Sequence, residues 1–123
     1  MRLRFIDDTM HGYLDVLVDL QLVGAGIAGA LTGVEPLAWA VPLTGGLANF
    51  TYSLLTNYAH GRRPVMSFRT HLILDALIGV CLLLATAATQ VFWYQAVLGA
   101  LGLGIVVAVA LTRPDVAREG AAV

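Results

Sequence analysis

The stretch Val91–Thr112 reads VFWYQAVLGALGLGIVVAVALT and contains no charged residue. An α-helix needs about 20 consecutive apolar residues to cross the ~30 Å hydrocarbon core of a bilayer, and this stretch is long enough. Its only strongly polar side chain is Gln95, close to its start. The stretch therefore predicts a membrane-spanning helix.

The rest of the chain has the same character. It has 123 residues, of which 59% are hydrophobic and 12% are charged, and its mean hydropathy is +0.81. In soluble domains about a quarter of the residues are charged. Three further apolar stretches have a similar length: Met10–Leu31, Leu37–Tyr58 and Thr70–Ala88. The sequence predicts an all-α integral membrane protein, a four-helix transmembrane bundle that forms one domain over residues 1–123.

The basic residues predict the orientation of the bundle. All seven are arginines, and they precede the first stretch, separate the second from the third, or follow the fourth: Arg2, Arg4, Arg62, Arg63, Arg69, Arg113 and Arg118. Because basic loops stay on the cytoplasmic side of a membrane, we expect both termini and the middle connection in the cytoplasm. The formal net charge of −1 gives no support for a nucleic-acid partner. The expected partner is the lipid bilayer.

Several common sequence motifs are absent from the chain. The N-terminal segment lacks the short apolar core and cleavage site of a signal peptide, so the first helix is expected to stay in the mature protein. The tail, residues 113–123, is expected to be flexible and cytoplasmic. The single cysteine, Cys81, cannot form an intramolecular disulfide. No nucleophile elbow, phosphate-binding loop, Cys-x-x-Cys or His-Glu-x-x-His motif occurs, so we assign no enzymatic activity.

An internal repeat divides the chain into two halves. His11 and Asp15 recur as His71 and Asp75, 60 positions later. The pair Leu55-Thr56 recurs 56 positions later at the end of the fourth stretch. We therefore expect two copies of a helical hairpin, at about residues 9–58 and 69–112. Because each copy crosses the membrane twice, both copies enter it in the same direction, as parallel repeats about an axis along the membrane normal.

The residues around this repeat resemble a known family. His-x-x-x-Asp opens the first and third stretches, and the segments YSLLTNY (52–58), GRRP (61–64) and FRTHLILD (68–75) follow the second. This pattern resembles small bacterial four-helix membrane proteins of the SPW-repeat type. The Ser-Pro-Trp triplet that names the family is absent, and Pro36, Trp39 and Trp93 lie in the corresponding regions. The resemblance implies a multi-pass protein of the bacterial inner membrane, and it implies no particular activity.

Polar residues within the apolar stretches are the candidate functional residues. His11, Asp15 and Asp19 are spaced by four positions and share one helix face. Asp19 lies about 12 Å deeper than His11 along the helix, where an unpaired carboxylate costs ~3 kcal/mol or more. Asn49 is expected at nearly the same depth and is the predicted partner of Asp19. The full predicted polar network or ion site comprises His11, Asp15, Asp19, Asn49, Tyr52, Thr56, His71 and Asp75.

Three interpretations of this network are open. The sequence favours an interhelical hydrogen-bond network in a small structural or accessory membrane protein without a cofactor. The second interpretation is a proton- or metal-handling carrier, in which two imidazoles and two carboxylates bind Zn²⁺. Its predicted metal ligands are His11, Asp15, His71 and Asp75, a quartet locally similar to those of cation-diffusion carriers. The third interpretation is a haem- or quinone-binding subunit that uses the two histidines.

Small and aromatic residues give predictions about packing. Small residues recur every four positions and would let helix backbones approach closely, within the chain or in a homo-oligomer or larger membrane complex. The predicted packing residues are Ala25, Gly29, Ala96, Ala100, Gly104 and Ala108. Trp39, Trp93 and Tyr94 near the outer ends, and Tyr13 and Tyr58 near the inner ends, are expected to be anchors at the membrane interface.

Overall fold

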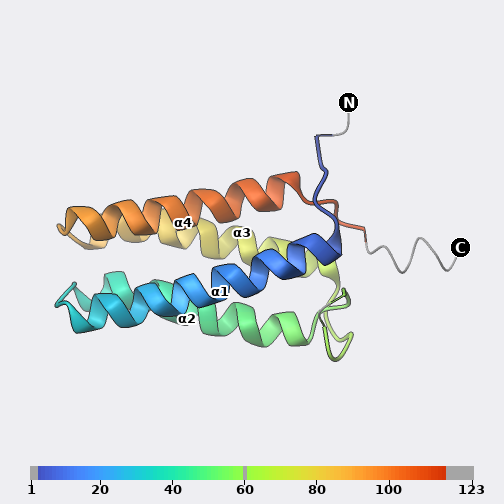
Figure 1. Cartoon of the computed structure of the whole chain (residues 1–123), viewed down its shortest axis with the longest axis horizontal. Helices are drawn as coiled ribbons and strands as arrows, with labels where there is room; N and C mark the ends of the chain where they lie inside the picture. Colours follow the sequence, from blue (N-terminus) through green and yellow to red (C-terminus); the bar gives the residue numbers. More distant parts are fainter. Residues whose placement is uncertain (1–2, 60, 116–123) are drawn as a thin grey trace, which may run out of the picture.

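The computed structural model describes residues 3–59 and 61–115, and these residues form four α-helices that run side by side along the long axis of the molecule (Figure 1). The helices are α1 (Asp8–Leu31), α2 (Pro36–Leu54), α3 (Phe68–Ala85) and α4 (Phe92–Leu111). A 3-10 turn, Thr86–Ala88, extends α3. The described residues contain two isolated β-bridges and no strand. The all-α prediction is thus confirmed.

Three of the four helices are long and apolar enough to cross a membrane: α1, α3 with its extension to Ala88, and α4. The second helix, α2, is not among them. It contains Pro42 and, toward its end, the polar residues Asn49, Tyr52 and Ser53, which reduce its hydropathy. It nevertheless lies alongside the other three over most of their length (Figure 1). The fourth membrane crossing therefore stays a prediction.

The second helix ends earlier than the sequence predicts, at Leu54 and not at Tyr58. The backbone N–H groups of Arg62 and Arg63 donate to the Leu54 carbonyl at 2.8 and 2.9 Å, and the N–H of Met66 donates to the Leu55 carbonyl at 2.7 Å. The loop thus satisfies the carbonyls that are left without partners at a helix end. Because the helix stops here, Tyr58 can turn into the bundle.

The helices pair as two hairpins, α1 with α2 and α3 with α4. In the second hairpin the backbones meet at two glycines, because a Cβ atom on Gly102 would lie 2.8 Å from the Gly79 carbonyl oxygen. The turn between α1 and α2 contains Gly33 at φ 79°, a conformation that favours glycine. The contacts between the two hairpins lie in the apolar core and at the polar end of the bundle, where α1 and α3 begin.

The two hairpins are joined by the same contact made twice, at the end of the bundle where α1 and α3 begin. Ile6, which precedes α1, forms a parallel bridge with Thr112 at the end of α4. Met66, which precedes α3, forms the equivalent bridge with Thr56 after α2. These pairs are related by the 60- and 56-position offsets of the sequence repeat. Each hairpin therefore begins against the end of the other.

The main apolar core fills the half of the bundle in which α1 and α3 end and α2 and α4 begin. Leu22, Leu82, Leu98 and Tyr94 are fully buried there, and the Tyr94 hydroxyl donates to the Ala25 carbonyl at 2.7 Å. The expectation that Tyr94 is an interfacial anchor is wrong. Its ring packs into the space that a side chain at Gly29 would occupy.

The predicted small-residue stripe of α4 lies largely on the surface of the bundle. Ala96, Ala100 and Gly104 are exposed, and a Cβ atom on Gly104 would meet nothing within 4 Å. Ala108 is half-buried. Arg2, His60, Arg118 and residues 116–123 of the predicted tail lie outside the described residues, whereas Arg113 at the start of the tail lies 4.0 Å from Asp7.

Candidate metal centre

The quartet His11, Asp15, His71 and Asp75 converges at the end of the bundle where α1 and α3 begin. His11 and His71 are each the fourth residue of their helix. Both helix starts are fixed by a capping side chain, because Asp7 accepts a hydrogen bond from Met10 N and Ser67 accepts one from Thr70 N. The aspartates follow one turn later on the same face.

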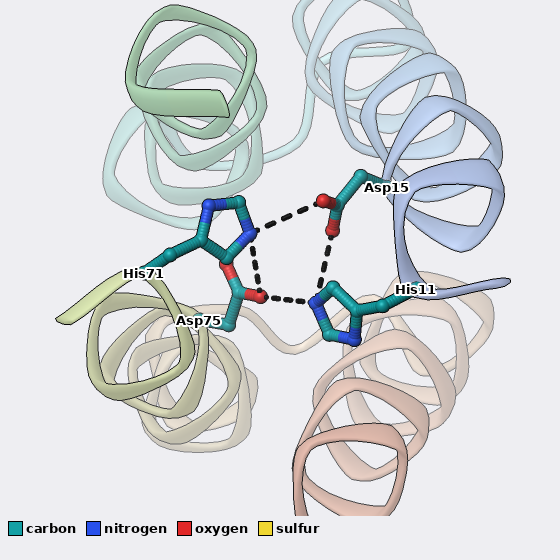
Figure 2. A group of neighbouring side chains, drawn as sticks. All are labelled: His11, Asp15, His71 and Asp75. Carbon is teal, nitrogen blue, oxygen red and sulfur yellow. Dashed lines mark hydrogen bonds and ion pairs between the residues drawn. The ribbon is translucent and has the colours of Figure 1, made fainter. Parts of the chain in front are cut away.

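Figure 2 shows the four side chains pointing toward one another from α1 and α3, which lie diagonally across the bundle. One candidate ligand atom from each residue lies within 4.8 Å of all the others, and all four residues are buried. The convergence that a shared site requires is therefore present. Each hairpin supplies one histidine and one aspartate, so neither can form the site alone.

The four residues form a ring in which histidines and aspartates alternate. Nε2 of His11 lies 2.9 Å from Asp75 Oδ2 and 3.3 Å from Asp15 Oδ1. Nε2 of His71 lies 3.1 Å from Asp15 Oδ2 and 3.2 Å from Asp75 Oδ2. Ligand atoms held ~2.0–2.1 Å from a zinc ion at tetrahedral angles are about 3.3 Å apart. The four His–Asp edges of the ring, 2.9–3.3 Å, are therefore close to this spacing, and one ligand atom from each residue lies within 4.8 Å of the others.

The other nitrogen of each histidine bonds to a threonine. Nδ1 of His11 lies 2.9 Å from Thr112 Oγ1, and Nδ1 of His71 lies 2.9 Å from Thr56 Oγ1. Each hydroxyl donates its own proton to a backbone carbonyl four residues earlier, at 2.6 Å. A threonine hydroxyl has one proton. It must therefore accept the second hydrogen bond, and each Nδ1 is the donor.

This arrangement determines what each Nε2 can do. With a proton on Nδ1, the Nε2 atom of a neutral histidine has a lone pair, and here it faces carboxylate oxygens that also have lone pairs. The arrangement is stable when a proton lies between each Nε2 and a carboxylate oxygen, or when a cation is bound between them. Nε2 of His71 is completely buried and lies between both carboxylates, yet it forms no hydrogen bond. A central cation would satisfy it.

Two tyrosines complete the surroundings of the carboxylates. The Tyr52 hydroxyl donates to Asp75 Oδ1, and the Tyr58 hydroxyl donates to Asp15 Oδ2 at 2.7 Å. Burial and the nearby Asp15 carboxylate raise the pKa of the Tyr58 hydroxyl, so this hydroxyl stays protonated and remains a donor. Such outer hydrogen bonds orient ligand carboxylates in metal sites.

Two of the predicted network residues, Asn49 and Asp19, form no described hydrogen bond with the quartet. Asn49 is buried, and its Oδ1 accepts a hydrogen bond from the Ser53 hydroxyl at 3.0 Å. Asp19 is also buried, but its Oδ1 has no hydrogen-bond partner. The predicted Asp19–Asn49 pair is absent among the described hydrogen bonds. Similar depth did not bring the two groups together, and the one described side-chain bond of Asn49 is with Ser53 in its own helix.

The structure adds residues that the sequence did not single out. Thr112 forms a hydrogen bond with His11, as Thr56 does with His71. The 56-position repeat, which relates Thr56 to Thr112, could have identified Thr112 from the sequence. Tyr58 was expected to be an interfacial anchor, and its burial at 5% exposure corrects that expectation. No sequence signal identified Tyr58, because its position depends on the early end of α2. The other predicted residues, Tyr52 and Thr56, contact the quartet directly.

These observations define the chain as an all-helical protein with three membrane-span-like helices and a buried His–Asp cluster. A comparison with protein-family models, curated proteins and solved structures gives no significant match. The resemblance to SPW-repeat proteins stays a prediction.

Proposed function

We propose that this chain is a multi-pass membrane protein whose quartet binds one divalent transition-metal ion of the zinc class. The observation that carries the proposal is the orientation of the two histidines. Both Nδ1 protons are committed to threonines, so both Nε2 atoms are directed at the same pair of carboxylates. Two imidazoles and two carboxylates at this spacing are a suitable ligand set for Zn²⁺.

Charge balance supports an exchange of the metal ion for protons. Two carboxylates carry two negative charges, and either two protonated imidazoles or one divalent ion neutralises them. Metal binding would therefore leave the charge of the buried cluster unchanged, which matters because a net charge within a membrane is costly. In the metal-free protein the same residues form the hydrogen-bond network that joins the two hairpins, and this is the structural role that the sequence favours.

The geometry gives less support to a haem site. The cavity beside the quartet has a volume of about 20 Å³, enough for about one water molecule. A haem between the two histidines would have to separate the aspartates that now lie between them. The compact quartet is suited to a single ion.

The membrane arrangement belongs to the same proposal. All four helices would cross the bacterial inner membrane, with the quartet near the cytoplasmic face and both termini in the cytoplasm. Support comes from the similar direction and extent of the four helices (Figure 1) and from Arg62, Arg63 and Arg69 at the quartet end of the bundle. This arrangement gives cytoplasmic ions the shortest route to the site.

Titration calorimetry of the purified, metal-free protein with zinc tests the proposed function. We expect one zinc ion per chain, and we expect His11→Ala or His71→Ala alone to abolish binding, because each removes one of four ligands. Thr51→Val is the matched control, since the Thr51 hydroxyl is exposed and bonds only to its own helix. Absence of zinc binding by the unmodified protein, or zinc binding that survives each histidine substitution, would show that the quartet is not the metal site.

A further inference from the structure

Beside the quartet, the first hairpin is more polar than the second. Relative to the second hairpin, the first carries further buried polar residues near the quartet, among them Asp19, Asn49 and Ser53. The 60- and 56-position offsets place Gly79, Ile105 and Val109 at the corresponding positions, and all three are apolar. The symmetric quartet therefore continues into the bundle as a polar branch along α1 and α2 alone.

A small cavity lies where this branch meets the quartet. Its polar lining comes from His11, Asp15, Asp75 and Asn49, and α1 and α4 supply apolar walls. The volume of about 20 Å³ exceeds the minimum for one water molecule, and the lining offers the two to four polar partners that a buried water needs. The cavity is therefore suited to an ordered water between the quartet and Asn49.

Asp19 lies at the deep end of the branch. It is 8% exposed, and its Oδ1 atom is buried without a hydrogen-bond partner. It is also the twelfth of the 24 residues of α1, so it lies at the middle of that helix. From Asp19 toward the end of α1 the core is apolar, with Leu22, Leu82 and Leu98 fully buried. Buried polar atoms without a protein partner are commonly satisfied by ordered water.

We infer that a one-sided water path leads from the quartet, through the cavity beside Asn49, to Asp19 at the centre of the bundle. Asp19 is a neutral carboxylic acid at the end of this path, and its proton exchanges with the cytoplasm through the water molecules. In each exchange the O–H bond of the acid breaks, its proton passes to a neighbouring water, and that water returns another proton. No electron is transferred and no net charge moves.

The path depends on the polar branch and not on a bound metal ion, so it can be tested on the metal-free protein. Infrared spectroscopy of the protein in lipid nanodiscs should show a carbonyl band of a protonated carboxylic acid that Asp19→Asn removes. This substitution preserves the shape of the side chain and breaks no described hydrogen bond. On transfer to D₂O the band should shift within minutes.

Two substitutions test the route itself. Asn49→Leu removes the polar wall of the cavity, and Val18→Ile adds a methyl group to its lining, so each should slow the deuterium shift at least tenfold. Thr51→Leu, on the exposed side of the same helix as Asn49, should leave the rate unchanged. The proposal is overturned if Asp19→Asn removes no acid band, if the band does not shift in D₂O, or if both cavity substitutions exchange at the unmodified rate. Zinc binding is measured separately, so its failure would leave these results intact.

Discussion

At the scale of single residues, the two threonines determine the chemistry of the site as much as its candidate ligands do. The hydroxyls of Thr56 and Thr112 each donate a hydrogen bond to a backbone carbonyl and accept one from Nδ1 of a histidine. The hydroxyls thereby fix both imidazole rings with Nε2 toward the carboxylates. Partners of this kind are worth roughly 10- to 100-fold in metal affinity.

Thr56→Val and Thr112→Val should therefore weaken zinc binding by about 10- to 100-fold each, because each leaves a ring without its orienting partner. Competition with a chelator of known affinity measures the change. The two substitutions occupy equivalent positions in the repeat and should have similar effects. Unchanged affinity in both would show that the threonines do not hold the rings.

Residue spacing alone predicted part of this site. The His-x-x-x-Asp repeat identified all four members of the quartet. A spacing of four places the histidine and aspartate of each pair on one face of their helix. Depth along the helix was a weaker guide, and it predicted an Asp19–Asn49 pair that does not form. Depth gives the level of a residue in the bundle but not the direction of its side chain.

At the scale of elements, the helix pairs depend on a few close backbone contacts. Gly79 and Gly102 bring α3 and α4 together, and Gly26 and Gly46 pack against the opposite helix of the first hairpin. The sequence stripe that was expected to serve this purpose in α4 is mostly exposed. Small residues show that close approach is allowed, but the face that is used depends on how each helix is rotated in the bundle.

Two glycines of α4 provide a matched comparison. Gly102→Ala should destabilise the protein by about 1–3 kcal/mol, because the new Cβ atom would meet the Gly79 carbonyl. Gly104→Ala should not destabilise it, since nothing lies within 4 Å of the added atom. Thermal unfolding in one detergent measures both. Equal effects on the melting temperature would contradict the close contact between α3 and α4.

The direction of the helices in the membrane can be tested at their connections. On a Cys81→Ala background, a cysteine placed at Gln90 should react with an impermeant thiol reagent in intact cells, and one placed at Ala59 should react only after lysis. Both positions are exposed and lie at opposite ends of the bundle. Labelling of Ala59→Cys from outside would contradict the orientation that the arginines predict.

At the scale of the whole molecule, two similar hairpins build one site that neither contains. The symmetric contacts at the quartet end of the bundle, Ile6 with Thr112 and Met66 with Thr56, bring α1 and α3 into register. The apolar stretches predicted the helices, and the repeat indicated two similar hairpins. The end of α2 and the burial of Tyr58 could not be read from the sequence, because loop hydrogen bonds between distant residues determine them. Oligomeric state and partner proteins stay predictions.

The central claim is that both hairpins bind one metal ion between them, and X-ray absorption at the zinc edge of the zinc-loaded protein tests it most directly. The account predicts four ligand atoms at about 2.0–2.2 Å, with the multiple-scattering signature of two imidazoles. His11→Ala and His71→Ala should each remove the ordered zinc signal. A six-oxygen shell, or a spectrum without imidazole scattering, would contradict the claim.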